Sequence, residues 1–154
     1  MKRFLAAATV GLLFVACGSA QAAQKPAGNG TTTASSAGTV VNVTLSDDMR
    51  IVADRSSVPA GTVTFHVTNT GKLTHEAVLL KTDIAYDQLP ANPQKAGKIV
   101  EDNGSTITHI GETDDMAGGT TKDFTVTVTS GKYVIVCNQP GHYAAGMRIP
   151  FTVQ

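Results

Sequence analysis

Apolar and polar residues alternate along much of the chain from residue 40 onward. In one clear example, Val63, Phe65 and Val67 are separated by threonine and histidine. A period of two places such apolar side chains on one face of a β-strand and the polar ones on the other. The same alternation, or a short apolar run bounded by turn residues, predicts strands at residues 40–45, 49–53, 62–68, 74–80, 107–110, 124–129, 133–137 and 147–153.

The number and length of these segments indicate the fold class. About seven or eight short strands in roughly 115 residues are typical of an all-β domain made of two packed sheets. Between residues 81 and 121 the alternation is largely lost, and a short helix is expected near residues 83–89. We therefore predict an antiparallel Greek-key β-sandwich with one irregular or helical insertion.

The first residues have the composition of an export signal. Lys2 and Arg3 precede an apolar run at residues 4–16, which is too short to span a bilayer as a mature helix. Two processing sites compete. The residues before Cys17 resemble a lipoprotein cleavage site, which would attach lipid to Cys17, whereas a small-x-small triplet fits ordinary cleavage after Ala22.

The chain is accordingly divided into an export signal at residues 1–22, a flexible linker at 23–38 rich in Ala, Gly, Ser and Thr, and a folded domain at 39–154. The protein is expected in the periplasm or cell envelope, either free or anchored through lipidated Cys17. The 12 basic and 12 acidic residues cancel, so no surface for nucleic acid is expected. The domain is expected to be a monomer.

One segment carries most of the candidate chemistry. Cys137, His142 and Met147 follow one another with Cys-x4-His-x4-Met spacing, where one predicted strand ends and the next begins. Because the chain reverses direction there, the loop can present a thiolate, an imidazole and a thioether to one point. This soft ligand set suits copper in both oxidation states, whereas zinc prefers four firm ligands.

Copper sites of this kind use a second histidine, which must come from elsewhere in the chain. His75 is favoured because it lies at the start of a predicted strand, just after turn residues. His109, in the irregular stretch, is an alternative. His66 lies in mid-strand among threonines and is expected at the surface.

Residues 40–154, and most closely the segment around Cys137, resemble the cupredoxins, in particular their azurin-like and sulfocyanin-like members. The resemblance implies one copper ion that alternates between Cu(I) and Cu(II). It also implies that His75, Cys137 and His142 are the strong ligands and that Met147 is the weak axial ligand.

Two positions depart from the cupredoxin pattern. Many members have Asn after the first ligand histidine and Ser or Thr after the cysteine, whereas this chain has Glu76 and Asn138. A hydrogen bond between these two side chains would replace the usual brace of the ligand loop. A carboxylate close to copper would also favour Cu(II) and lower the reduction potential.

The resemblance implies transfer of single electrons between redox proteins, with His142 as the exit for the electron. Partner proteins are expected to dock around it, on Pro140, Tyr143, Ala144 and Ala145, because weak redox partners use small surfaces of this kind.

No enzymatic activity is expected, because Asn138 stands where multicopper oxidases have the histidine that leads to a second copper centre. Two other functions remain open. One is a copper carrier or buffer with an exchangeable site, assisted by Met116 or Met49. The other is an interaction module that uses the same sandwich without metal.

Overall fold

The structure is a computed structural model and describes residues 38–154. The predicted export signal, with the alternative processing at Cys17, lies outside the described residues, as does the predicted linker except for Gly38. The described chain forms nine strands: β1 (Thr39–Ser46), β2 (Arg50–Ala53), β3 (Ser57–Val58), β4 (Gly61–Asn69), β5 (Val78–Thr82), β6 (Ile107–Glu112), β7 (Thr121–Val128), β8 (Gly131–Val136) and β9 (Arg148–Val153).

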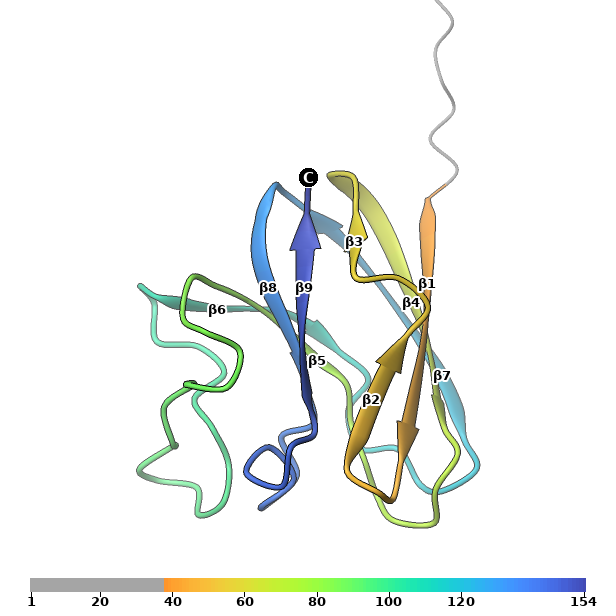
Figure 1. The fold of residues 1–154 in the computed structure, drawn as a ribbon, viewed down its shortest axis with the longest axis vertical. Coiled ribbons are helices and arrows are strands. Elements are labelled where there is room, and N and C mark those ends of the chain that lie inside the picture. The colour runs from red at the N-terminus through yellow and green to blue at the C-terminus, as the bar shows by residue number, and fades with distance from the viewer. Residues whose placement is uncertain (1–37) are drawn as a thin grey trace, which may run out of the picture. The chain divides into compact units, whose positions relative to one another are not determined.

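The strands form two sheets that face each other, in the order β2-β1-β4-β7 and β3-β9-β8-β5-β6 (Figure 1). The predicted all-β sandwich is confirmed, but both sheets are mixed. β1 pairs parallel with β4, and β3 pairs parallel with β9. The reason is the path of the chain: after the β1–β2 hairpin it joins the other sheet as β3 and turns at Pro59-Ala60-Gly61. It then returns beside β1 as β4, in the same direction as β1.

The main core lies between the sheets and is built from the alternating apolar residues. Val63, Phe65 and Val67 are fully buried, as the period of two predicts. The ring of Phe65 stacks on Phe124 at 4.9 Å and meets Phe151 edge-on at 5.6 Å, so β4, β7 and β9 share one aromatic contact. This core also includes Cys137, which directly follows β8, and Met147, which directly precedes β9.

The insertion between β5 and β6 covers the outer face of the second sheet. Val78 and Leu80 of β5 point away from the main core and pack in a second buried cluster with Leu89 and Ile99 of the insertion. β5 is therefore buried on both faces, which explains its continuous apolar run.

The short helix expected near residues 83–89 is not formed, because this part of the insertion consists of turns, bends and extended segments. Side chains take up backbone donors of this segment instead: the Thr82 hydroxyl accepts from Ile84 N at 3.1 Å and the Tyr143 hydroxyl accepts from Leu89 N at 2.9 Å, and such bonds compete with a helix. Pro90 and Pro93 also lack the backbone donor that a helix needs. Within residues 38–154, no helix has the length and apolar character required to cross a bilayer.

Candidate metal centre

The loop of residues 137–147, between β8 and β9, closes on itself (Figure 1). Cys137 N donates to Met147 O at 3.0 Å, and Met147 N donates to His142 O at 3.0 Å. Gly141 and Gly146 have φ of 84° and 110°, a conformation that glycine adopts without strain. The backbone thus holds the three residues of the Cys-x4-His-x4-Met segment next to one another.

His75 reaches the same place from the connection between β4 and β5. It forms an isolated bridge with Met116, with His75 N donating to Met116 O at 3.1 Å and Met116 N to His75 O at 2.7 Å. Asn69, at the end of β4, is fully buried and donates from Nδ2 to Met116 O at 3.0 Å and to Leu73 O at 2.8 Å. His75 is therefore fixed between two segments that are far apart in the sequence.

Three ligand atoms converge. The Nδ1 atoms of His75 and His142 lie 3.1 Å apart, and Cys137 Sγ lies 3.3 Å from His142 Nδ1 and 3.9 Å from His75 Nδ1. All three atoms lie within 4.8 Å of one another, and no other group of three His, Cys, Asp or Glu side chains in the described residues meets this spacing. Two imidazoles and one thiolate around a point are the donors of a trigonal copper site, so the residues fit the metal.

Burial differs among the residues of the centre. His75, Cys137 and Met147 have no exposed surface, whereas His142 is half-buried. The thioether of Met147 is in the core, and its backbone bonds to both Cys137 and His142. The centre therefore reaches the surface through His142.

The surroundings set the charge state of the centre. Burial raises the pKa of the Cys137 thiol to about 11, although hydrogen bonds from the backbone of Gln139 and Glu76 work in the other direction. Burial, and then the neighbouring His75, lower the pKa of His142, so its ring favours the neutral form. A metal ion would therefore displace the thiol proton and find an imidazole with a free lone pair.

Glu76 and Asn138 do not bond to each other, so the brace predicted between them is wrong. Asn138 is fully engaged with the insertion: its Oδ1 accepts from Ile99 N at 2.7 Å, and its Nδ2 donates to Ile99 O at 3.2 Å and to Glu101. The Glu76 backbone N–H points at Cys137 Sγ at 3.4 Å, and its buried carboxylate lies 3.8 Å from Lys98 Nζ. Burial raises the pKa of this carboxyl group.

The other two histidines lie apart from this cluster. His66 is on the exposed face of β4, where its Nδ1 lies 2.6 Å from Asp123 Oδ1, as expected for a surface residue. His109 is on β6, with Nε2 3.7 Å from Glu112. Of the two methionines considered for an exchangeable copper site, Met116 is fully buried and Met49 is half-buried against the main core.

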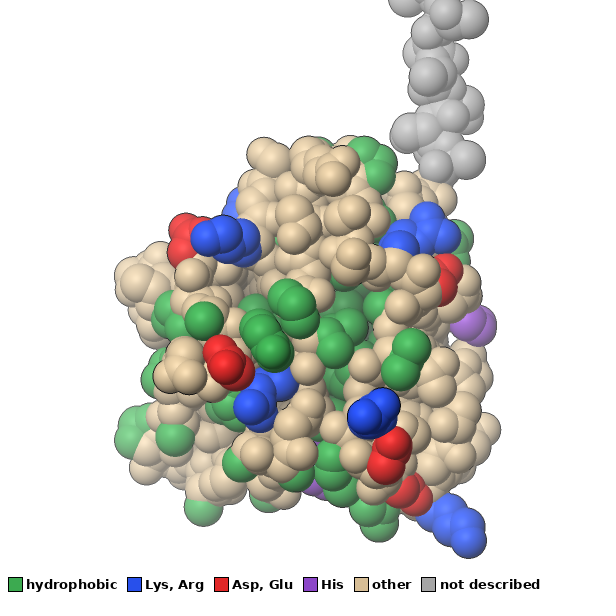
Figure 2. Space-filling view, viewed as in Figure 1, with side chains coloured by type: hydrophobic (Ala, Val, Ile, Leu, Met, Phe, Trp, Pro, Cys, Tyr) green, Lys and Arg blue, Asp and Glu red, His purple; other side chains and the backbone are tan. Residues whose placement is uncertain are grey.

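One expected docking residue faces inward. Tyr143 is buried, and its hydroxyl accepts from Leu89 N at 2.9 Å and donates to Tyr86 O at 2.9 Å. Pro140, Ala144 and Ala145 are exposed. Hydrophobic side chains gather at the lower end of the molecule in Figure 2, with a histidine among them. Tyr143 therefore anchors the ligand loop to the insertion and is not part of the exposed patch.

Two residues that support the centre were missed at the sequence level. Asn69 marks the end of a predicted strand, but its sequence position does not reveal that it is buried beside Met116. Asp47 lies in the turn between β1 and β2, and its Oδ1 lies 3.1 Å from His75 Nε2. An Asp in a turn is ordinary, so only the three-dimensional contact could identify it.

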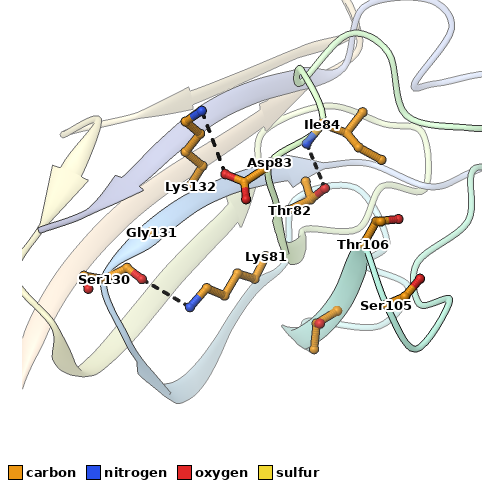
Figure 3. Close-up of a pocket in the computed structure, with 10 residues that line it drawn as sticks. Lys81, Thr82, Asp83, Ile84, Ser105, Thr106, Ser130, Gly131 and Lys132 are labelled. Atoms are coloured by element: carbon orange, nitrogen blue, oxygen red, sulfur yellow. Dashed lines mark hydrogen bonds and ion pairs between the residues drawn. The ribbon is translucent and has the colours of Figure 1, made fainter.

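A hollow of about 620 Å³ lies at the other end of the second sheet (Figure 3). It surrounds the start of β8, whereas Cys137 follows the end of that strand. Its two lysines already have partners: Lys81 Nζ donates to Thr129 Oγ1 at 2.6 Å, and Lys132 lies 3.8 Å from Asp83. This hollow is thus separate from the metal centre.

Comparison with known proteins identifies the family. Residues 29–154 match the sulfocyanin (SoxE) domain family. The fold is similar to reduced auracyanin from the photosynthetic bacterium Roseiflexus castenholzii, with 25% identity and a TM-score of 0.57 over 75% of this chain and 97% of that one. No curated protein sequence matches the chain.

Two further solved structures share the fold. Auracyanin A of Chloroflexus aurantiacus, described as a blue copper protein, has 23% identity and a TM-score of 0.55, over 75% of this chain and 98% of that one. Reduced rusticyanin has 24% identity and a TM-score of 0.52, over 76% and 81%. The chain therefore belongs to the sulfocyanin domain family of the cupredoxins, and its cofactor is a single copper ion.

Proposed function

We propose that this chain carries single electrons between redox proteins of the cell envelope, with copper held by His75, Cys137 and His142 and, more weakly, by Met147. The observation that carries the proposal is the convergence of two imidazole Nδ1 atoms and one sulfur within 4.8 Å. Cupredoxins are electron carriers and generally not enzymes, which supports the same role. Copper held by these residues would supply a couple that gains and loses one electron.

The protein supplies a site that is already assembled. The ligand loop is tied to the insertion by Gly141 N, which donates to Gly97 O at 2.8 Å, in addition to the bonds of Asn138 and Tyr143. A ligand set that is held in place by surrounding contacts changes little between oxidation states, and small rearrangement makes electron transfer fast.

His142 is the exit for the electron in this proposal. It is the half-buried member of the centre, and Pro140, Ala144 and Ala145 are exposed in the same loop. Leu73, in the loop before His75, has 47% of its surface exposed. A small apolar surface around one imidazole suits brief docking of a redox partner, in contrast to a permanent interface.

The location in the cell envelope rests on the export signal predicted at residues 1–22 and on the generally extracytoplasmic location of cupredoxins. Attachment through lipidated Cys17 is testable by fractionating membranes from cells that express Cys17→Ala. Release of the variant from the membrane fraction would support the anchor, and unchanged attachment would contradict it. The mass of the mature wild-type protein would distinguish lipidation at Cys17 from cleavage after Ala22.

The decisive test is the visible spectrum of the purified protein after one equivalent of Cu(II) is added. We expect an intense thiolate-to-copper band in the wild type and its loss in Cys137→Ser. His75→Ala should also lose it, whereas the matched variant His109→Ala should keep it.

Two other results would contradict the proposal. Copper binding without the thiolate band would favour a copper carrier, although full burial of His75, Cys137 and Met147 favours slow exchange. Absence of binding, with unchanged stability in the presence of copper, would leave a metal-free interaction module.

A further inference from the structure

The second nitrogen of His75 has a partner of its own. The Nδ1 atom faces Cys137 and His142, and the Nε2 atom on the other side of the ring lies 3.1 Å from Asp47 Oδ1. An ionised carboxylate only accepts hydrogen bonds, so Nε2 carries the proton and Nδ1 keeps its lone pair. This is the tautomer that a metal at Nδ1 requires.

The Asp47 carboxylate is held firmly by the loop that precedes His75. Its Oδ2 accepts from Lys72 N at 2.8 Å, and its Oδ1 accepts from Leu73 N at 3.2 Å. A side chain at Gly71 would place its Cβ only 1.9 Å from Asp47 Oδ1. The loop is therefore shaped around this carboxylate and leaves no room for a larger residue at Gly71.

The contact also joins two separate parts of the fold. Asp47 lies in the turn between β1 and β2 of the first sheet, at the same end of the sandwich as the ligand loop (Figure 1). Thr70 ties the two parts together a second time, because its backbone N and its hydroxyl both donate to Leu45 O at 2.9 Å. The position of Asp47 relative to His75 is thus fixed by backbone contacts.

We propose that Asp47 is a positioning residue for copper. It fixes the tautomer and orientation of His75, and its negative charge favours Cu(II) over Cu(I) and so lowers the reduction potential. The proposal rests on His75 being a ligand, as argued above. Its physical basis is general: a carboxylate that accepts the distal N–H of a ligating imidazole increases the basicity of that ligand.

The chain offers a matched control in the next residue. Asp48 carries the same charge in the same turn, but its side chain points to Ser46 and to Arg50, 3.5 Å away, and is 63% exposed. Asp48→Asn therefore removes a nearby charge without touching His75. Asp47→Asn removes the charge and keeps the shape of the side chain.

The test compares these two variants with the wild type, all loaded with copper, at one fixed pH. For Asp47→Asn we expect about a 10- to 100-fold loss of Cu(II) affinity, a smaller loss of Cu(I) affinity and a higher midpoint potential. Asp48→Asn should match the wild type. An Asp47→Asn protein with wild-type potential and Cu(II) affinity would overturn the proposal, even if its copper-free form were less stable.

A measurement on the wild type keeps the proposal testable if Asp47→Asn does not fold. In the diamagnetic Cu(I) form, nitrogen NMR should show the His75 ring protonated at Nε2, with a proton that exchanges slowly with water. An unprotonated or rapidly exchanging Nε2 would overturn the role of Asp47. A wild type without the thiolate band would instead contradict the electron-carrier function, so the two failures are distinguishable.

Discussion

The two halves of the metal centre are held in different ways. Cys137, His142 and Met147 come from one loop, which the insertion grips from outside the sandwich through Gly97 and Ile99. His75 comes from the connection between β4 and β5 and is braced by residues of the first sheet and its turns. The three residues of the loop are thus close in sequence and depend on the insertion between β5 and β6. His75 depends instead on contacts between distant parts of the sandwich.

We expect the free energy of unfolding to depend more on the contacts that brace His75 than on those that hold the ligand loop, and Asn69→Ala tests this. The fully buried Asn69 side chain makes three hydrogen bonds, to Leu73 O, to Met116 O and from Gly71 N. Its removal breaks all three bonds, although Met116 O keeps its bond from His75 N, so we expect a loss of about 3 kcal/mol in the free energy of unfolding of the copper-free protein. Urea unfolding measures it. A loss no larger than that of an exposed substitution such as Gln94→Ala would contradict the assignment.

The corresponding change in the loop half is Asn138→Ala. It breaks the two bonds between Asn138 and the backbone of Ile99, which is itself buried. We expect about 2 kcal/mol of destabilisation, less than for Asn69→Ala because Asn138 makes two hydrogen bonds to backbone groups and Asn69 makes three. The same unfolding experiment ranks the two variants, and the opposite order would show that the insertion matters more than the brace on His75.

Much of the fold could be predicted from sequence, because a period of two directly reports which face of a strand is buried. Phe65 and Phe151 lie in the core as their patterns require. The parallel pairing of β1 with β4 could not be predicted, since alternation reports a face and not a direction or a neighbour. The expected helix near residues 83–89 is absent, and the hydroxyls of Thr82 and Tyr143 accept from the backbone N–H groups of Ile84 and Leu89.

The metal centre, like the fold, could be predicted from the sequence only in part. The spacing of Cys137, His142 and Met147 brings them together in one loop, and the position of His75 after a turn favoured it over His109. The residues that brace the ligands could not be predicted, because Asn69, Asp47 and Asn138 bond to partners up to 47 residues away in the sequence. The error at Glu76 and Asn138 has this origin: both flank ligands, but Asn138 is satisfied by the backbone of the insertion.

A pair of glycine variants isolates the contact between the insertion and the ligand loop. Gly97 and Gly104 have similar φ of 75° and 70°, so alanine is strained at both. A Cβ at Gly97 would lie 3.0 Å from Gly141 N, whereas a Cβ at Gly104 would meet nothing within 4 Å. We expect Gly97→Ala to be about 1 kcal/mol less stable than Gly104→Ala, and to alter the thiolate band of the copper form. Equal stability and unchanged spectra would mean that the ligand loop tolerates displacement.

The smallest expected change in stability concerns the carboxylate of Asp102, in the insertion. The pKa of Asp102 is lowered, first by the hydrogen bond from Gly104 N and then by that from His109 N. A lowered folded-state pKa stabilises the fold above the unfolded value of about 4, and this contribution is lost as the pH falls through the folded value. The free energy of unfolding of Asp102→Asn should therefore lie slightly below that of the wild type at pH 7.

This gap should remain constant down to about pH 5 and close at lower pH, when Asp102 in the wild type becomes protonated. Urea unfolding of both proteins from about pH 3 to pH 7 measures it. Asp87 is exposed and has no side-chain hydrogen bond within residues 38–154, so it provides the control Asp87→Asn, which should match the wild type at pH 7. If the difference in free energy of unfolding between Asp102→Asn and the wild type were unchanged near pH 3, the charge of Asp102 would not stabilise this part of the insertion. The insertion would then depend on its apolar contacts and on Asn138.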